Sequence, residues 1–349
     1  MRIASTLGAS VALLLCANSA TAGNPPNLAS QVDPSLADYA KPQRLVSLRD
    51  GRRIHLFCLG HGAPTVILTA GLGDWVATWR KLQAPIAKKT RACAWDRAGF
   101  GYSDPSPVPQ GVNHTTADLE EALINADIPG PYILIGHSMG GYESMIFADR
   151  DHRAVLGMLL IDPSFPDEIR RANLVAPLFG AFLSKSIDER AVMAKKCAAV
   201  FASTAIGNGT RNSKPCLEYP ATLPLELKKA MGRLDRNPRR WTTQASAFEN
   251  FPTSSRVVIN NDRAYGDMTI RILTAPDPFP PNMPADAPAD WPPFAAELNS
   301  AHDAMAALST DGTNRLIGGT NHVSIKDIRT DVVLAAVDDV IAKIRRASH

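Results

Sequence analysis

Residues 132–141 read Tyr-Ile-Leu-Ile-Gly-His-Ser-Met-Gly-Gly, an apolar run followed at once by a glycine-flanked serine. A continuous apolar run of this kind is typical of a central parallel strand that is buried on both faces. Gly136 and Gly140 leave room for a sharp turn into a helix, which we expect to run to about Asp149. The pattern therefore predicts that Ser138 stands on a strained strand-to-helix turn, with its hydroxyl open to a reactant.

Short apolar runs on both sides of this strand alternate with amphipathic stretches. Runs bounded by Gly, Pro and polar residues favour strands, whereas the stretches with apolar residues at helical spacing favour helices. We expect strands at residues 53–59, 65–70, 91–95, 155–161, 268–275 and 314–318, and helices at 79–88, 116–126, 293–308 and 331–345. The alternation predicts an α/β fold whose units stack in one sheet.

The alternation stops after Asp162 and resumes at Met268. Because the intervening segment has helical patches but no regular strands, we interpret residues 163–267 as a cap inserted into a single core of residues 44–162 and 268–349. The proline-rich stretch from Pro276 to Pro293 predicts an irregular loop within that core.

A serine hydroxyl is a weak nucleophile at neutral pH, so a base must accept its proton during attack. His322 is our candidate base, because it follows the last expected strand and precedes the last expected helix. The rival His302 lies within an expected helix, where no strand end positions it. We interpret His137 as packing behind Ser138.

A carboxylate should orient the imidazole, and two aspartates are candidates. Asp162 and Asp277 each follow an expected strand, so both lie at the sheet edge where ligands gather in open α/β sheets. We favour Asp162, because Asp277 is wedged between Pro276 and Pro278 in a loop whose path the sequence does not define. Asp277 remains the alternative acid.

Backbone N–H groups should stabilise an oxyanion that develops when Ser138 attacks a carbonyl. Met139 supplies one donor, since it follows the serine directly. The second is expected from the loop after residues 65–70, which reads Ala-Gly-Leu-Gly-Asp, and we choose the N–H of Leu72.

The first 22 residues have the pattern of a cleavable signal peptide, with Arg2, a short apolar run and the small residues of Ala20 to Ala22. The run is too short to span a bilayer, so we expect a secreted or periplasmic protein without stable membrane insertion. Residues 23–43 lack periodicity and are expected to form a flexible N-terminal segment.

Cleavage would leave four cysteines, Cys58, Cys93, Cys197 and Cys216. An even number in an exported protein suggests two disulfides, for which the sequence alone allows three pairings. No Cys/His cluster has the spacing of a zinc site, so we expect no metal.

The composition is that of an ordinary globular protein, with 45% hydrophobic residues, 20% charged residues and a formal net charge of +3. Such a modest charge creates no strong field for nucleic acid or for a membrane surface. We therefore expect a small molecule, rather than a nucleic acid, as the partner.

Taken together, these motifs resemble the α/β-hydrolase superfamily, over about Leu45 to Ala347. The resemblance rests on the Ala70-Gly71 pair, the stretch Asp96-Arg97-Ala-Gly-Phe-Gly-Tyr-Ser103 and the turn at Ser138. It implies a mostly parallel eight-stranded sheet with helices on both faces and an inserted helical cap. Asp96 and Arg97 would serve the architecture, in a buried ion pair that orients loops near the site.

The resemblance also implies a disulfide pairing and leaves the choice of acid open. Cys58 and Cys93 match neighbouring strands of the family, which pairs them and leaves Cys197 with Cys216. The family most often takes its acid after the penultimate strand, where this chain has Ala275-Pro276-Asp277-Pro278. Because that stretch departs from the family's usual pattern, Asp162 stays in contention.

The expected activity is hydrolysis of small carboxylic esters through an acyl-enzyme, with Ser138, His322 and a carboxylate forming a set that needs no cofactor. The alternatives are an aminopeptidase or amidase of the same fold, and a non-catalytic binding protein on the same scaffold.

Overall fold

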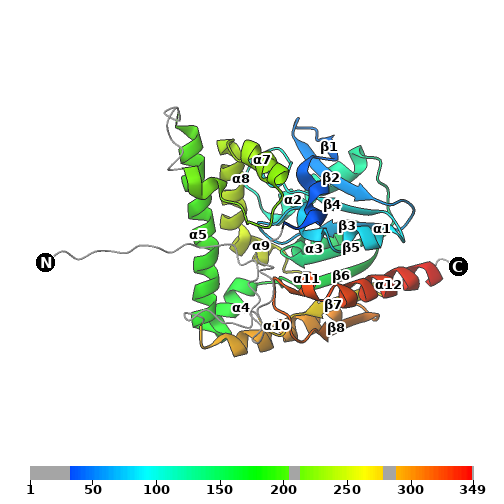
Figure 1. Ribbon diagram of the computed structural model, residues 1–349. Coiled ribbons are helices and arrows are strands. Elements are labelled where there is room, and N and C mark those ends of the chain that lie inside the picture. The colour runs from blue at the N-terminus through cyan, green and yellow to red at the C-terminus, as the bar shows by residue number, and fades with distance from the viewer. Residues whose placement is uncertain (1–31, 204–212, 278–287, 348–349) are drawn as a thin grey trace, which may run out of the picture.

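The structure is a computed structural model that describes residues 32–203, 213–277 and 288–347. An eight-stranded sheet runs through the molecule in the order β1-β2-β4-β3-β5-β6-β7-β8 (Figure 1). Its strands are β1 (Arg44–Ser47), β2 (Arg53–Leu59), β3 (Thr65–Thr69), β4 (Ala92–Trp95), β5 (Tyr132–Ser138), β6 (Val155–Pro163), β7 (Thr269–Thr274) and β8 (Gly312–Leu316). β2 pairs antiparallel with β1 and β4, and the other neighbours pair parallel, which confirms the expected mostly parallel sheet.

The central strand β5 is buried on both faces because its side chains alternate between two hydrophobic cores. Ile133 and Ile135 belong to one core, with Val337 of helix α12 (Thr330–Ala347) and Ile86 of α1 (Gln83–Ala87). Leu134 belongs to the other core, which includes residues of helices α2 (Val112–Asn125), α3 (Gly140–Arg150) and α10 (Trp291–Ala306). Helices therefore cover both faces of the sheet, as expected for buried parallel strands.

The helices between β6 and β7 gather on one side of the sheet, with the long α5 outermost (Figure 1). They are α4 (Glu168–Val175), α5 (Pro177–Ala202), the short η4 (Lys214–Leu217), α7 (Leu225–Leu234), α8 (Pro238–Glu249) and α9 (Phe251–Val257). Among the residues described, no helix combines the length and the apolar character that a bilayer span requires.

Two expectations from the sequence were wrong in detail. The helix expected at 79–88 is two short pieces, η3 (Val76–Trp79) and α1. Pro85 explains the break, because its ring and missing N–H do not fit the interior of a continuous helix.

Residues 23–43 were expected to be flexible, but Pro34–Ala40 form the 3-10 helix η2. Its Leu36 and Tyr39 are buried.

Some of the sequence expectations concern residues outside the described ranges. These are the signal peptide at 1–22, the first part of the flexible segment up to residue 31, and most of the proline-rich loop, residues 278–287. The strand β1 at the sheet edge was not assigned from the sequence.

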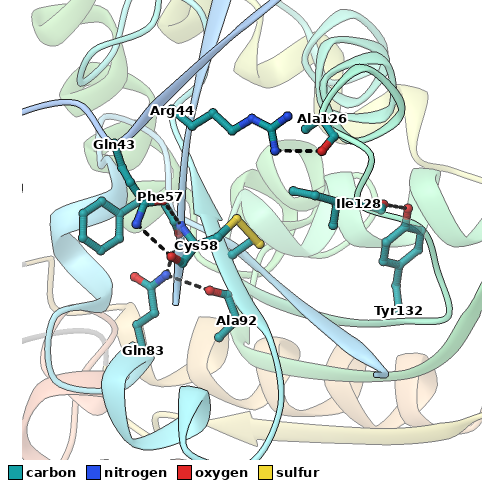
Figure 2. Close-up of a disulfide and its surroundings, with 10 residues drawn as sticks. Gln43, Arg44, Phe57, Cys58, Gln83, Ala92, Ala126, Ile128 and Tyr132 are labelled. Carbon is teal, nitrogen blue, oxygen red and sulfur yellow. Dashed lines mark hydrogen bonds between the residues drawn. A yellow bond between two sulfur atoms is a disulfide. The ribbon is translucent and has the colours of Figure 1, made fainter. Parts of the chain in front are cut away.

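The disulfides join Cys58 to Cys93 and Cys197 to Cys216, the pairing that the resemblance implies. Cys58 and Cys93 face each other directly across the antiparallel β2–β4 pair, with a Cα–Cα distance of 4.0 Å. Glutamine side chains reinforce the same strand ends (Figure 2). Gln43 Nε2 donates to the Cys58 carbonyl at 2.8 Å, and Gln83 Nε2 donates to the carbonyls of Phe57 and Ala92 at 2.6 and 3.0 Å.

Candidate functional site

Ser138 ends the central strand β5, where its backbone adopts the unusual conformation of a tight turn. Its φ is 55°, in the left-handed region that non-glycine residues rarely adopt. A Cβ on Gly136 would lie 2.4 Å from the Gly140 oxygen, and a Cβ on Gly140 would lie 2.3 Å from the Thr69 oxygen. Because only glycine fits at both positions, the Gly-x-Ser-x-Gly pattern is a steric condition for this strained turn.

His322 lies in the loop between β8 and the short helix α11 (Ile325–Ile328), and its ring is held by Asp162. The Asp162 Oδ2 atom is 2.6 Å from His322 Nδ1. Oδ1 of the same carboxylate accepts the Ala275 N–H at 2.8 Å. Since a carboxylate accepts hydrogen bonds, Nδ1 of His322 carries the proton and Nε2 is left with a lone pair. A histidine in this tautomer can accept a proton at Nε2.

Of the two candidate acids, the structure brings Asp162 to the His322 ring. Asp162 is buried, at 2% exposure, and stands near the end of β6 with a φ of 40°. Asp277 instead forms an isolated parallel β-bridge with Asn321, the residue before His322. This bridge ties the loop of Asp277 to the loop of His322 through the backbone.

His137 links Ser138 to His322. Its Nε2 lies 2.8 Å from the His322 carbonyl oxygen and donates to it, and the two rings are in contact, with centroids 4.9 Å apart and planes tilted by 31°. Burial, followed by the nearby Lys326 charge, holds the pKa of His137 well below its ordinary value, so this ring is neutral at physiological pH. Because His137 directly precedes Ser138, its hydrogen bond to the His322 carbonyl fixes the His322 backbone close to the serine.

The rival histidine His302 is fully buried and engaged at both ring nitrogens. Nδ1 lies 2.7 Å from Thr274 Oγ1, and Nε2 donates to the Pro163 carbonyl at 2.7 Å. Both contacts lie at strand ends next to Asp162. His302 therefore supports the backbone around Asp162, and neither of its nitrogens is open to a reactant.

The oxyanion loop, which we define as residues 70–74, lies against Ser138. A Cβ on Gly71 would be 3.3 Å from Ser138 Cβ. Arg97 also holds this loop, as its guanidinium donates to the carbonyls of Gly71 at 2.8 Å and Ala70 at 2.5 Å. In a trans peptide the N–H points opposite to the preceding C=O, so the Leu72 N–H points away from Arg97.

The two expected oxyanion donors are open in the structure. Neither the Leu72 nor the Met139 N–H donates a hydrogen bond to any of the residues in 32–203, 213–277 and 288–347. Met139 directly precedes helix α3, whose amino-terminal end also favours negative charge. The arrangement can stabilise a developing negative charge beside Ser138.

Asp96 and Arg97 are both buried, and each pairs with a residue other than its neighbour in the chain. Asp96 accepts hydrogen bonds from His55 Nδ1 at 2.6 Å and from the Val76 N–H at 2.8 Å. Arg97 forms a buried ion pair with Glu143 of α3, with Nε–Oε1 at 2.7 Å. Glu143 was missed from the sequence, although a carboxylate five residues after Ser138 on a buried helix face was a signal for such a partner.

We expect Arg97→Met to lower the free energy of unfolding by about 3–5 kcal/mol, because it leaves the buried Glu143 without its counter-charge. The double variant Arg97→Met/Glu143→Met should recover part of this loss, since it removes both charges but leaves the Ala70 and Gly71 carbonyls without the Arg97 donor. Urea denaturation of the three proteins measures the effect. Equal destabilisation in the single and double variants would contradict the pairing argument.

Within the described residues, no group of three or more His, Cys, Asp or Glu side chains converges as metal ligands would. The contacts near Ser138 are instead pairwise: His322 is hydrogen-bonded to Asp162, and its ring contacts that of His137.

Comparisons with known proteins agree with the fold described above. A family model described as alpha/beta hydrolase fold matches residues 64–257, more than half of the chain. Uncharacterized proteins match shorter stretches: one of Schizosaccharomyces pombe is 29% identical over 150 residues, covering 35% of this chain and 28% of its own length. One of Bacillus subtilis is 32% identical over 108 residues, covering 31% and 43%. The matches thus span less than half of these curated relatives.

Solved structures match nearly the whole fold at low sequence identity. A putative acyltransferase from Salmonella enterica has a TM-score of 0.62 at 14% identity, covering 86% of this chain and 95% of its own. A thermophilic esterase from Thermogutta terrifontis has a TM-score of 0.54 at 16% identity, covering 87% and 99%. A putative lipase from Acinetobacter baumannii has a TM-score of 0.56 at 16% identity, covering 89% and 94%. At these identities the likeness concerns the fold.

Proposed function

The chain belongs to the α/β-hydrolase fold family, and we propose that it hydrolyses small carboxylic esters through a serine acyl-enzyme. The observation that carries the proposal is the His322–Asp162 hydrogen bond at 2.6 Å, held beside the strained turn of Ser138. This fold supports many reactions, so the argument rests on the site rather than on the fold.

In the proposed reaction, Ser138 Oγ attacks the ester carbonyl carbon while His322 Nε2 takes the hydroxyl proton. The N–H groups of Leu72 and Met139 stabilise the tetrahedral oxyanion. When the C–O bond to the alcohol breaks, His322 returns the proton to the leaving oxygen. Water then attacks the acyl-enzyme with His322 again as base, which releases the carboxylic acid and restores Ser138.

The structure gives less support to the aminopeptidase alternative. Such an enzyme would need acidic side chains to hold a substrate amine, and the acidic residues after β6 include Asp167, Glu168 and Glu218. Burial raises the pKa of Glu168, and Tyr142 OH already lies 3.1 Å from its Oε2. Asp167 pairs with Arg170, and Glu218 is exposed. Esters therefore remain the favoured substrates.

Two further parts of the proposal concern organisation and location. We propose that residues 163–267 form a cap over the core, since Phe248 of α8 approaches the oxyanion loop. We also propose that the protein is exported, with residues 1–22 as its signal peptide. Two disulfides support export, because they persist in oxidising compartments.

The test combines active-site labelling with substrate profiling. A fluorophosphonate should label the purified mature protein once, at Ser138, as located by peptide mass spectrometry. p-Nitrophenyl esters from acetate to dodecanoate should be hydrolysed, and the matched p-nitroanilides should be hydrolysed far more slowly. Labelling at another residue, or hydrolysis of anilides in preference to esters, would overturn the proposal.

The pH dependence of kcat/KM should report the His322–Asp162 pair. Burial opposes protonation of the ring, but the hydrogen bond and charge of Asp162 outweigh it, so the pKa of His322 is raised above its ordinary 6.5. Because the base must be neutral, activity should rise with pH through a midpoint above 6.5. A midpoint below that value in initial-rate measurements would contradict the assignment.

A further inference from the structure

Arg190 of helix α5 places its guanidinium at the oxyanion loop. A Cβ on Gly73 would lie 3.6 Å from Arg190 Nη1 and 3.3 Å from Phe248 Cζ. The guanidinium carbon lies over the Phe248 ring, 5.9 Å from its centroid. Phe248 is 7% exposed, so the ring is a fixed platform, whereas Arg190 itself is exposed to solvent. The cation therefore lies beside Gly73, in the loop whose Gly71 is next to Ser138.

Arg190 differs from the other cations of this loop in having no carboxylate partner. Arg97 is paired with Glu143, and Lys326 lies 3.9 Å from Asp74. No ion pair involves Arg190 within 32–203, 213–277 and 288–347. Its neighbours one helical turn away, at positions i±3 and i±4, are Ser186, Ile187, Met193 and Ala194, none of which is acidic.

A guanidinium in this position has the properties of an anion receptor. It presents a planar set of donors that matches a carboxylate with two parallel hydrogen bonds, and the aromatic face orients it. Gly73 has a φ of 88° and carries no side chain, so nothing on that residue blocks the approach to the guanidinium. Gly71 and Gly73 are two peptide units apart, at most ~7 Å between Cα atoms, so the guanidinium lies beside the loop residue that follows shortly after the one next to Ser138.

We propose that Arg190 is a specificity-determining residue that selects esters whose acyl chain carries a carboxylate. The proposal rests on the ester hydrolysis proposed above and names a substrate class for it. The carbonyl end of the substrate lies at Ser138 and the oxyanion donors, and the carboxylate end pairs with Arg190. A contact that favours anionic over neutral esters changes the ratio of their kcat/KM values, because kcat/KM measures the transition state relative to free enzyme and free substrate.

The experiment compares p-nitrophenyl monoesters of adipate, suberate and sebacate with the neutral heptanoate, nonanoate and undecanoate esters of similar length. A 6-(trimethylammonio)hexanoate ester supplies the opposite charge. We expect kcat/KM for at least one anionic ester to exceed that of its neutral partner by about three- to tenfold, a modest factor because Arg190 is exposed. The cationic ester should be the poorest substrate, and added salt should reduce the preference.

Three variants separate the effect of the Arg190 charge from the effect of its packing and from that of other positive charges on the same helix. Arg190→Gln should abolish the preference for the anionic ester and leave the rate with neutral esters nearly unchanged. Arg190→Lys keeps the charge and should retain part of the preference. Lys196→Gln removes one exposed positive charge from the same helix, about 9 Å further along its axis, and should retain all of it. Thermal melts verify that each variant is folded.

Each outcome bears on one proposal. If neutral esters are hydrolysed with Ser138 labelled but no anionic ester is preferred, the role of Arg190 is overturned and the proposed function stands. A preference that survives in Arg190→Gln overturns the assignment to this residue. If no ester is hydrolysed and Ser138 is not labelled, the proposed function itself fails.

Discussion

Replacement of Ser138 by alanine is expected to lower kcat for ester hydrolysis by about 10⁵- to 10⁶-fold. The reason is that the acyl-enzyme needs an oxygen at this position, and no other hydroxyl stands on the strained turn between β5 and α3. Initial rates with a short p-nitrophenyl ester, and loss of fluorophosphonate labelling in the same variant, measure the effect. A residual hydrolysis above the uncatalysed rate would come from the oxyanion donors alone.

A matched control uses a serine outside the site. Ser186 lies on α5, and its Oγ donates to the Phe182 carbonyl at 2.8 Å within the helix. Ser186→Ala should keep activity within about twofold of the unchanged protein, because it removes only this local hydrogen bond. Both variants should melt near the temperature of the unchanged protein. Labelled, active Ser138→Ala protein would exclude Ser138 as the nucleophile.

The second large effect is expected from Asp162→Asn, which should lower kcat by about 10⁴-fold through the wrong histidine tautomer. In the variant, the amide oxygen is needed to accept the Ala275 N–H, which lies 2.8 Å from Oδ1. The amide NH₂ group then faces His322 Nδ1 and donates to it. The ring proton is forced onto Nε2, where it blocks the acceptance of the Ser138 proton.

Asp277→Asn is the control that separates the two candidate acids, and we expect it to reduce kcat by less than about tenfold. The Asp162→Asn variant should also lose the raised pKa of His322, so the acidic limb of its residual kcat/KM moves to lower pH. Stopped assays from pH 5 to 9 on both variants measure these changes. A loss in Asp277→Asn that matches or exceeds the loss in Asp162→Asn would assign the acid to the later strand.

Much of the sheet could be predicted because strands and glycine turns depend on neighbouring residues. The run at 132–135 and the glycines around Ser138 define a buried strand and its exit without any distant partner. The expected strands at 53–59 and 65–70 correspond to β2 and β3 for the same reason. Local signals failed where contacts with distant residues determine the structure. The 3-10 helix η2 at residues 34–40 is an example, because Leu36 and Tyr39 pack into a hydrophobic core formed by other parts of the chain.

The site required contacts between residues that are far apart in the chain. His322 and Asp162 are separated by 160 positions, and Arg97 and Glu143 by 46. From the sequence, Asp162 and Asp277 were both at strand ends and stayed open as alternatives. The positive φ of Asp162 and the Ala275 N–H orient its carboxylate towards the His322 ring. Neither the positive φ nor the contact with the Ala275 N–H can be predicted from the residues that flank Asp162 in the sequence.

The amino-acid pattern alone thus establishes the α/β class, the buried central strand and a serine on a strained turn, since these follow from period, side-chain size and glycine conformation over short stretches. The partner of each polar group followed only from the folded chain. Asp162 orients His322, Glu143 neutralises Arg97, and Arg190 faces the oxyanion loop without a counter-charge among the described residues. The physical reason is that hydrogen bonds and ion pairs act over a few ångströms in space, and only the packing of strands and helices in the folded chain brings these distant segments within that range.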